Sequence, residues 1–586
     1  MNIYAEVGAK IRKAILALQS EGAVPEELEL TGIDIQEPRD PTHGDLASNA
    51  AMVLAKRAGL KPRELATAIT AKLSLDPDLS RVEVAGPGFI NMALEVTVWH
   101  QLLKTVLSER EAFGSSQLGA GRRLQVEFVS ANPTGPMHIG HCRGAVFGDT
   151  LSNLLAFVGF GVEREYYVND AGAQVDKLGQ STLLRYREAL GEDIGEIPEG
   201  LYPGDYLKSI GQRLANIFGN ALLEMDATEA LAKARECAVE TLLQRIKDDL
   251  ALLNVHHDVF FSERSLTANG RDQVAEAIGV LREKGLITMG RLPRPLGFDD
   301  EEWEDREQTV FKSTDFGDDI DRALIKSDGN YTYFAYDVAY HYNKIERGFD
   351  GYFNVLGADH IGYVTRLNAV VTALSDGNAK FETPVTQLVR VLRAGQPVRM
   401  SKRAGSFVAL RDVVDEVGRD PVRFMMMMRK HDSPLDFDLT KVVEQSKDNP
   451  VFYVQYAHAR TKSAFRAARE VFPQLTEMCE EVSEADLSLL VDEGELILIR
   501  EISKFPRIVE GAAREREPHR IAFYLYDLAS AFHQQWSRGY DSPQLRFSQK
   551  DNVKLTSARL ALVAATQQVI ASGLTILGVN APLEMR

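Results

Sequence analysis

Cysteine and tryptophan are scarce in this sequence. Of its 586 residues, three are cysteines and three are tryptophans. Cys142, Cys237 and Cys479 lie far apart in the chain, so neither a disulfide framework nor a paired-cysteine metal site is expected. A small, odd number of cysteines fits a reducing compartment, and the sequence therefore predicts a cytoplasmic protein.

Long apolar runs, internal repeats and low-complexity tracts are also lacking. No uninterrupted apolar run approaches the ~18 residues needed to cross a bilayer, so no membrane partner is expected. Near the start, Ile3, Val7, Ile11 and Ile15 recur at helical spacing with charges between them. This pattern predicts an amphipathic helix in place of a signal peptide. The chain is also too long for one hydrophobic core, so several domains are expected.

The first 115 residues are predicted to form a small α/β domain. A segment rich in glycine and serine, 111–123, is the first candidate linker. The expected elements are an N-terminal helix, a strand at 31–36, helices at about 45–57 and 61–74, and two strand pieces within 81–96.

The next region reads as the start of a parallel sheet. In 123–130, Leu124, Val126 and Phe128 alternate with polar neighbours, which predicts a strand. A Gly-rich turn, a helix and a second strand at 162–170 follow, as in a parallel α/β unit. The segment 171–300 is mainly helical and charged, like an insertion.

Further α/β signals cover 352–362 and 386–395, and from about 441 the sequence reads as amphipathic helix. The predicted fold class is multidomain α/β with a Rossmann-like parallel-sheet core. The expected domains are 1–115 (small α/β), 116–440 (core, with a helical insertion at about 171–300) and 441–586 (all-α).

The turn before the first core helix carries the stretch NPTGPMHIGHCRGAVFGD, from Asn132 to Asp149. The start of a helix that follows a parallel strand has unpaired N–H groups and partial positive charge, both of which favour anions. His138 and His141 add donors three residues apart on one face. On this stretch alone, a phosphate-binding role, an ordinary histidine pair and a two-histidine zinc pair all remain open.

A second motif decides between these interpretations. After the strand-like segment ending at Gly395 comes QPVRMSKRAG, a basic Met-Ser-Lys loop. Together, in this order, the two motifs resemble the HIGH and KMSKS signatures of class I aminoacyl-tRNA synthetases. Arg399 and Arg403 depart from the usual first and last positions of the second signature, whereas the central lysine, Lys402, is present.

Over nearly its whole length the sequence resembles the arginyl-tRNA synthetase family. Three segments carry the resemblance: VEFVSANPTGPMHIGHCRG, DGNYTYFAYDVAYHYNKIERGFD and NVLGADHIGYVTRL. The N-terminal DPTHGDLASNAA and VAGPGFINMAL are similar to the extra N-terminal, tRNA-binding domain of that family. The helical end is similar to its anticodon-binding domain.

The resemblance implies a set of site residues. The motif positions imply catalytic roles for His138, His141 and Lys402; ATP contacts from Pro133, Gly135, His138, Gly140, His141, Met400, Ser401 and Lys402; and arginine contacts from Glu127, Asn132, Tyr333 and Asp337. Asp359 and His360 are assigned to the arginine or adenylate site because they follow the predicted strand FNVLGA, and open α/β sheets bind ligands just past such strands. The chemistry agrees, because a guanidinium is a planar fork of donors that requires carboxylate or amide acceptors. A buried carboxylate at position 127 also needs a cationic partner.

The implied reaction has two steps, adenylation of arginine by ATP and transfer of the arginyl group to tRNA. Mg²⁺ is expected to accompany ATP without a dedicated protein metal site. The expected partners are arginine, ATP and tRNA-Arg, and a monomer is expected. Family resemblance also implies that activation waits for tRNA.

The net charge of −17 counts against a tRNA partner, so the distribution of charge matters. On the predicted helix at 449–470, Lys462, Arg466 and Arg469 share one face. Cations can contact phosphates there while aromatic rings stack on unpaired bases. A solvated helix face with core tyrosines explains each residue equally well. The predicted tRNA-binding residues are Tyr453, Tyr456, His458, Arg460, Lys462 and Arg466, with Trp536 as a weaker candidate.

Three alternatives are weighed against this interpretation. Another class I synthetase, such as a glutaminyl or cysteinyl type, does not call for carboxylates at both Glu127 and Asp337. A small-molecule nucleotidyltransferase shares the H-x-G-H chemistry but has no use for a helical domain with basic and aromatic faces. A non-enzymatic RNA-binding protein does not need both phosphate motifs.

Overall fold

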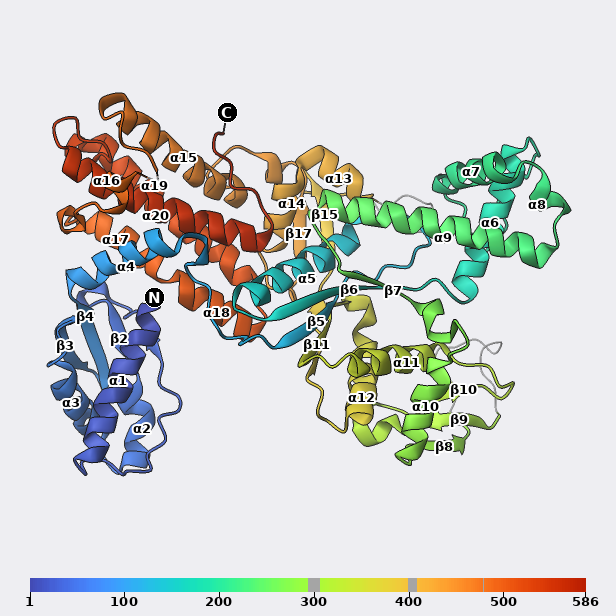
Figure 1. The fold of residues 1–586 in the computed structure, drawn as a ribbon, viewed down its shortest axis with the longest axis horizontal. Coiled ribbons are helices and arrows are strands. Elements are labelled where there is room, and N and C mark those ends of the chain that lie inside the picture. The colour runs from blue at the N-terminus through green and yellow to red at the C-terminus, as the bar shows by residue number, and fades with distance from the viewer. Residues whose placement is uncertain (293–305, 399–407, 478, 586) are drawn as a thin grey trace. The chain divides into compact units, whose positions relative to one another are not determined.

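The computed structural model describes residues 1–292, 306–398, 408–477 and 479–585. The chain divides into two compact units. The first unit comprises Met1–Ser116, Ser446–Arg516 and Arg520–Arg586, and the second comprises Gln117–Gln445 with Glu517–His519. Figure 1 shows the helices and strands of both units along the chain.

A five-stranded parallel sheet forms the centre of the second unit. Its strand order is β13-β11-β5-β6-β7, and every neighbouring pair is parallel. The chain runs from β5 outward through β6 to β7, and later adds β11 and β13 on the other side of β5. The strand order therefore reverses between β5 and β11, which is where open α/β sheets bind ligands. The strands are β5 (Arg123–Glu127), β6 (Gly161–Val168), β7 (Val259–Ser262), β11 (Gly351–Asn354) and β13 (Phe381–Glu382).

Helices cover both faces of this sheet. Helix α5 (Ile139–Phe157) joins β5 to β6 on one face, and α11 (Tyr333–Glu346) lies on the other (Figure 1). Gly148 of α5 is required for close packing, because a Cβ there would lie 2.2 Å from the Phe128 side chain. On the opposite face, Glu127 at the end of β5 contacts Lys344 of α11.

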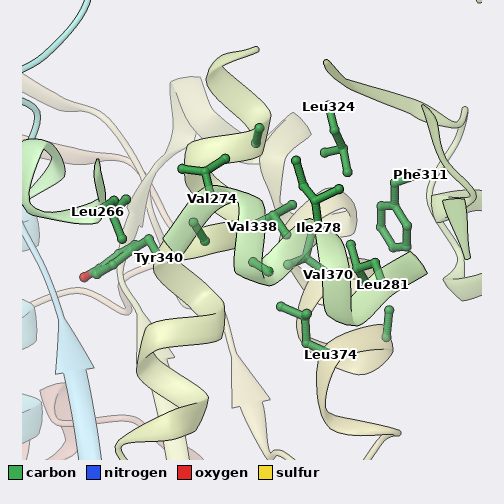
Figure 2. Packing of buried hydrophobic residues seen from close by; sticks show 14 residues of the cluster. Leu266, Val274, Ile278, Leu281, Phe311, Leu324, Val338, Tyr340, Val370 and Leu374 are labelled. Atoms are coloured by element: carbon green, nitrogen blue, oxygen red, sulfur yellow. The ribbon is translucent and has the colours of Figure 1, made fainter. Parts of the chain in front are cut away.

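An apolar core fixes α11. Figure 2 shows side chains from α10 (Gln273–Glu283), α11 and α12 (Val364–Ser375) packed together with residues of two strands, β9 (Gln308–Phe311) and β10 (Arg322–Ile325). Each large side chain buried in this way stabilises the fold by roughly 1.5–3 kcal/mol. Because the apolar side of α11 is held here, its polar side is fixed against the sheet. The labelled core residues are Leu266, Val274, Ile278, Leu281, Phe311, Leu324, Val338, Tyr340, Val370 and Leu374.

The segment predicted as a mainly helical insertion, at about 171–300, also contains strands. Its first run of helices ends at Leu252, and β7 follows before helix α10 begins at Gln273. Strand β7 joins the parallel sheet, and β8 (Ile287–Gly290) pairs with β9 and β10 in a separate antiparallel sheet. Strands of four residues are too short to show a clear alternation in sequence. The helices are α6 (Ala173–Ala189), α7 (Lys208–Phe218), α8 (Ala221–Glu224) and α9 (Ala227–Leu252).

Two other sequence expectations need correction. The strand predicted at 123–130 ends at Glu127, because Val129 and Ser130 adopt positive φ. The strand signal at 386–395 does not belong to the main sheet. Part of it forms β14 (Val385–Thr386), which pairs with β12 (Leu356–Gly357). The rest forms β15 (Val389–Arg393), which pairs with β16 (Gln396–Pro397) and β17 (Leu435–Asp438). Helices α13 (Leu410–Val417) and α14 (Arg419–Met426) lie between β16 and β17 in the chain.

The first unit combines the N-terminal α/β region with the C-terminal helices. Within it, Arg500 lies 2.8 Å from Asp45, and Lys504 lies 3.0 Å from Glu37. Its N-terminal elements are α1 (Ile3–Ser20), β1 (Ile35–Gln36), β2 (Leu46–Ser48), α2 (Ala50–Ala58), α3 (Pro62–Leu73), β3 (Leu79–Ala85), β4 (Phe89–Leu94) and α4 (Val96–Glu109). Its C-terminal helices are α15 (Pro450–Val471), α16 (Glu480–Ser483), α17 (Glu493–Ser503), α18 (Phe505–Glu515), α19 (His519–Asp541) and α20 (Val553–Leu577).

Helix α20 is the core helix of the C-terminal bundle. By length and composition it is apolar enough to cross a membrane, and it is the only such helix among the described residues. However, 72% of its apolar window is buried inside the molecule. Its hydrophobicity is therefore explained by packing against the surrounding helices, as expected for a helix that is apolar on all sides.

Candidate active site

A cavity of about 600 Å³ opens at the carboxyl ends of β5 and β11. Its wall combines residues 129–132 after β5, His138 and His141 at the start of α5, residues 355–360 after β11, and residues 386–389. These segments are far apart in sequence and meet at the point where the strand order reverses. The cavity is therefore in the position where this sheet architecture binds ligands.

The backbone is strained where β5 enters this cavity. Val129 and Ser130 have φ angles of 70° and 40°, a region that residues other than glycine rarely adopt. Each such residue costs about 1–3 kcal/mol and is retained when the surrounding structure holds it. Here the Ser130 hydroxyl accepts a hydrogen bond from the Tyr167 N–H at 3.0 Å and donates one to Glu127 Oε1 at 3.0 Å. The strained turn thus connects the end of β5 to its neighbour β6.

The two histidines of the first signature cap helix α5. His138 Nδ1 accepts from the Gly140 N–H at 3.1 Å, and His141 Nδ1 accepts from the His138 N–H at 3.3 Å. Their rings stack with centroids 3.8 Å apart. Because Nδ1 is the acceptor in both rings, each neutral ring carries its proton on Nε2. The pair therefore presents N–H donors at a helix N-terminus, where the backbone itself favours anions.

The backbone around His138 pairs with the segment that follows the second signature. His138 and Ala409 form an isolated antiparallel bridge. The Ile139 N–H donates to the Val408 carbonyl at 3.2 Å, and the Leu410 N–H donates to the Met137 carbonyl at 3.0 Å. Residues 408–410 therefore lie directly against the first signature. The predicted ATP-contacting residues Met400, Ser401 and Lys402 lie outside the described residues.

Arg143, which was not singled out in the sequence, anchors the first turns of α5, two residues after His141. Its guanidinium donates to the carbonyls of Gln387 at 3.0 Å, Lys430 at 2.8 Å and Ser433 at 2.6 Å. The residue is 1% exposed, and burial lowers the pKa of Arg143 to about 10. A guanidinium bound to three carbonyls positions backbone and is not itself aimed at a substrate. The signal in the sequence was an arginine within an otherwise buried helix.

An acidic cluster lies where α11 begins. Asp337 is half-buried, and its pKa is raised to about 7, first by desolvation and then by the charges of Glu263 and Glu127, with a smaller opposing effect of Arg366. Glu263, at the carboxyl end of β7, is buried and accepts a 2.5 Å hydrogen bond from the Tyr167 hydroxyl. Burial also raises the pKa of Glu263.

No cation of the described chain forms an ion pair with Asp337 or Glu263, whereas most buried acids have one. Glu263 was missed in the sequence analysis. In the sequence, the only indication of a role for Glu263 is its position directly after β7, a short strand that was not predicted. The cluster is an acidic site at which the described residues place no cation within ion-pair distance, which is the arrangement that a cationic ligand requires.

Glu127 differs from these two acids. Its Oε2 accepts a 2.5 Å hydrogen bond from the Nζ of Lys344, which is 1% exposed. The sequence argument that this carboxylate needs a cation is confirmed, but the cation belongs to the chain itself. Glu127 is therefore not a vacant acceptor for a guanidinium in the way that Asp337 is.

The other predicted arginine contacts are more exposed. Tyr333, one helical turn before Asp337, is 67% exposed. The Asn132 side chain donates to Gln174 Oε1 at 3.0 Å, at the start of α6. Asp359 and His360 lie on the cavity wall in the turn after β12, and the His360 Nε2 is 3.7 Å from the Asp359 carboxylate.

Pro133 and Gly135 belong to the loop before the first signature. The Tyr206 hydroxyl, from the segment between α6 and α7, donates to the Thr134 carbonyl at 2.6 Å. An added Cβ at Gly135 would lie 3.5 Å from this hydroxyl. The segment between α6 and α7 therefore holds the loop that leads into the start of α5.

In the first unit, the predicted tRNA-binding residues all lie on α15. The Arg460 guanidinium lies 4.3 Å from the centre of the Tyr456 ring and 5.4 Å from that of Trp536. Tyr453 contacts the ring of His533, with centroids 4.5 Å apart. These residues form one aromatic and cationic surface. Trp536, the weaker candidate from the sequence, belongs to the same surface through its contact with Arg460.

The remaining α15 residues are already partnered within the unit. Lys462 lies 2.5 Å from Glu477, and Arg466 lies 3.3 Å from Glu584. His458 is 3% exposed, and its Nδ1 is 2.7 Å from the Pro582 carbonyl. Of the predicted tRNA-binding residues, His458 is therefore the one that the structure buries inside the bundle, together with its neighbours Ala457 and Ala459.

Three parts of the chain match known protein families. Residues 5–94 match the arginyl tRNA synthetase N terminal domain, residues 102–191 the catalytic domain of tRNA synthetases class I (R), and residues 454–585 the DALR anticodon binding domain. With the parallel sheet and the histidine-capped helix at its strand ends, these matches define a class I aminoacyl-tRNA synthetase.

Full-length relatives give the amino-acid specificity. The chain is 58% identical to the arginine–tRNA ligase of Xanthobacter autotrophicus over 586 residues, covering 100% of both chains. The crystal structure of a putative arginyl-tRNA synthetase from Campylobacter jejuni is 31% identical, with a TM-score of 0.72 over 84% of this chain and 100% of that one. The arginyl-tRNA synthetase of Thermus thermophilus, at 20% identity and a TM-score of 0.69, shares the fold over 98% and 99% of the two chains. The chain belongs to the arginyl-tRNA synthetase family, and its activity is the ATP-dependent ligation of arginine to tRNA.

Proposed function

We propose that the acidic cluster of Asp337 and Glu263 binds the guanidinium of arginine, while the cavity beside it binds ATP and the reacting end of arginine. The observation that carries this assignment is the half-buried Asp337 carboxylate, whose pKa of about 7 reflects burial beside two other acids. A guanidinium placed against it supplies the missing positive charge. Tyr333, Asn132, Asp359 and His360 contribute contacts around the same substrate, and Glu127 contributes from the end of β5.

In the first step, an oxygen of the arginine carboxylate attacks the α-phosphorus of ATP, and the bond to pyrophosphate breaks. The attacking oxygen is already ionised, so the step requires positioning and charge stabilisation without a general base. His138 and His141 donate to the triphosphate from Nε2, at the start of α5. Lys402 neutralises the charge that develops on pyrophosphate, and Pro133, Gly135, Gly140, Met400 and Ser401 line the nucleotide.

Mg²⁺ enters with ATP in this proposal. Among the described residues, no group of three or more His, Cys, Asp or Glu side chains is arranged to hold a metal ion. Mg²⁺ that is bound with a nucleotide usually keeps several waters and phosphate ligands, and we expect the same coordination here.

In the second step, the terminal ribose 2′-hydroxyl of tRNA-Arg attacks the carbonyl carbon of arginyl-adenylate, and AMP leaves. Residues 441–586 bind the anticodon and residues 1–115 form an additional tRNA contact. Tyr453, Tyr456 and Arg460 offer stacking and cation contacts to unpaired bases. Lys462 and Arg466 contact phosphates by exchanging their acidic partners. The enzyme acts as a cytoplasmic monomer.

ATP–pyrophosphate exchange with each amino acid, with and without tRNA-Arg, tests this proposal. Arginine alone should support exchange, because lysine offers a point charge in place of a planar fork and citrulline lacks the charge. Exchange that depends on the presence of tRNA-Arg is expected. Equal exchange with citrulline would show that the acidic cluster is not the specificity site.

A further inference from the structure

Lys344 is the only buried lysine among the described residues. Its Nζ donates to Glu127 Oε2 at 2.5 Å and to Asn354 Oδ1 at 2.7 Å, and it lies 4.4 Å from the centre of the Tyr340 ring. These contacts come from β5, β11 and α11. The ammonium is therefore fixed between the two strands whose carboxyl ends form the cavity.

The same contacts extend from Lys344 to Asp337. Because Asn354 accepts from Lys344 through Oδ1, its Nδ2 donates to His341 Nε2, at 3.2 Å. His341 Nδ1 then carries the proton and donates to the Asp337 carbonyl at 2.8 Å. Burial lowers the pKa of His341 to about 3, so this ring is a neutral relay of hydrogen bonds. The hydrogen bonds that begin at Lys344 thus reach Glu127 through its carboxylate and Asp337 through its backbone carbonyl.

A second ion pair, formed by the partly exposed residue that caps the end of α11, provides the comparison. Arg347 lies 2.5 Å from Glu165 and 3.0 Å from Glu163, both on β6. Lys344 and Arg347 are three residues apart, so they lie on one side of the helix. Both pairs fasten α11 to the sheet, but only the Lys344 pair includes an acid at the cavity end of a strand.

Stability alone does not account for Lys344. A buried ion pair contributes little net stability relative to apolar residues of the same size, because desolvation offsets the attraction. Its effect on Glu127 is more specific. A carboxylate that is held by a buried ammonium keeps one orientation. Ser130 binds the other oxygen of Glu127 at 3.0 Å, so both oxygens have fixed partners.

We propose that Lys344 is a positioning residue for arginine binding. It holds Glu127 as an oriented anion and neutralises it, so that the uncompensated charge of the site is confined to Asp337 and Glu263, where a guanidinium is bound. This inference rests on the proposed role of Glu127 in the arginine site. Lys344 itself touches neither substrate, and it acts through Glu127 and Asn354.

The test uses four variants of the full-length enzyme: Lys344→Met, Glu127→Gln, the double variant, and Arg347→Met as the matched control. ATP–pyrophosphate exchange with tRNA-Arg gives KM for arginine and for ATP. Lys344→Met should raise the arginine KM about 10-fold or more, since it leaves a buried carboxylate unpaired, and should change the ATP KM by less than about 2-fold. Arg347→Met removes a similar ion pair and should lower the melting temperature with little change in the arginine KM.

The double variant separates positioning from packing. Adding Lys344→Met to Glu127→Gln should raise the arginine KM no further, because the residue through which the lysine acts is already altered. This comparison also holds if Lys344→Met alone fails to fold, since the double variant removes both charges together. Additive effects, or an arginine KM unchanged in a folded Lys344→Met, would overturn the positioning role. If Glu127→Gln itself leaves the arginine KM unchanged, the proposed place of Glu127 in the site fails instead.

Discussion

The carboxylates at the start of α11 and the cations of α15 are both charged groups assigned to a substrate, and they differ in their internal partners. Asp337 and Glu263 form no ion pair with the described part of the chain, and burial raises the pKa of each. On α15, Lys462 and Arg466 already face Glu477 and Glu584. The carboxylates at the start of α11 therefore lack a cationic partner among the described residues, whereas the cations of α15 must leave an acidic partner before they can contact tRNA.

This difference predicts different energetics for the two substrates. A buried, uncompensated acid lowers the stability of the free enzyme and interacts strongly with the cation that neutralises it. An exposed cation with an acidic partner contributes little to stability and little to binding, because it exchanges one ion pair for another. Arginine recognition should therefore depend on a few residues, whereas tRNA binding should be spread over many.

The largest effect is expected for Asp337→Asn. This change keeps the shape of the side chain and removes its charge, so the arginine KM should rise by roughly 30-fold or more, which corresponds to about 2–5 kcal/mol. The ATP KM should stay nearly constant. Exchange kinetics across arginine and citrulline should also show a narrower preference for arginine. Glu263→Gln should act in the same direction, and an arginine KM unchanged in both variants would remove the contrast between the two sites.

The same Asp337→Asn change should stabilise the enzyme in the absence of arginine. The pKa of Asp337 is about 7 in the folded protein, above the value of about 3.9 for an unfolded chain. Between these values the folded state retains a proton that the unfolded state has lost, so stability falls as the pH rises. At about pH 8 the variant should be more stable by roughly 1–2 kcal/mol, after allowance for partial exposure of the side chain.

Thermal unfolding of the arginine-free enzyme at several pH values measures this difference. The gap between parent and variant should close as the pH falls toward about 4, where the unfolded aspartate also becomes protonated. A parent enzyme that is the more stable of the two at alkaline pH would indicate that Asp337 is compensated internally.

The pH dependence of arginine use should follow the same carboxylate. Ionised Asp337 binds the guanidinium, and its pKa is about 7. The value of kcat/KM for arginine should therefore approach a plateau above pH ~8 and should fall about 10-fold from pH ~8 to pH ~6. In Asp337→Asn this limb should be absent. Initial rates at limiting arginine and saturating ATP and tRNA provide the measurement, and a parent profile that is flat in this range would contradict the assignment.

The smallest effect is expected on α15. Arg466→Glu should weaken tRNA binding by about 3-fold and reduce the slope of log K against log salt by about one unit. Glu584→Gln is the matched control, because it releases Arg466 from its 3.3 Å ion pair and should strengthen tRNA binding slightly. Filter binding at several salt concentrations measures both slopes. Identical slopes in the parent and Arg466→Glu would mean that this face is only solvated.

Much of the fold could be predicted from sequence because its signals are local. The alternation of Leu124, Val126 and Phe128 marked β5, and the glycine-rich turn marked the start of α5. Short strands could not be recognised, since the four residues of β7 do not distinguish a strand from a helix segment. The two short strands within the predicted helical insertion, β7 and β8, were missed for this reason.

The residues of the candidate site show the same distinction between local signals and long-range contacts. Asp337 and His138 were predicted as site residues because they lie within motifs that resemble a known family. Lys344, Glu263 and Arg143 were missed, because their importance comes from burial and from partners more than 70 residues away in the chain. Sequence can indicate that a buried carboxylate needs a cation, but only the fold shows whether the cation is a substrate or a side chain of the protein.

Calorimetric titration of the enzyme with arginine, in buffers of different ionisation enthalpy, tests the central claim most directly. If Asp337 receives the guanidinium, arginine binding at about pH 7 should release about half a proton, since its pKa in the free enzyme is about 7. The release should fall toward zero at about pH 9 and should vanish in Asp337→Asn. A binding enthalpy at pH ~7 that is the same in every buffer would contradict the claim that arginine supplies the missing counter-ion of Asp337.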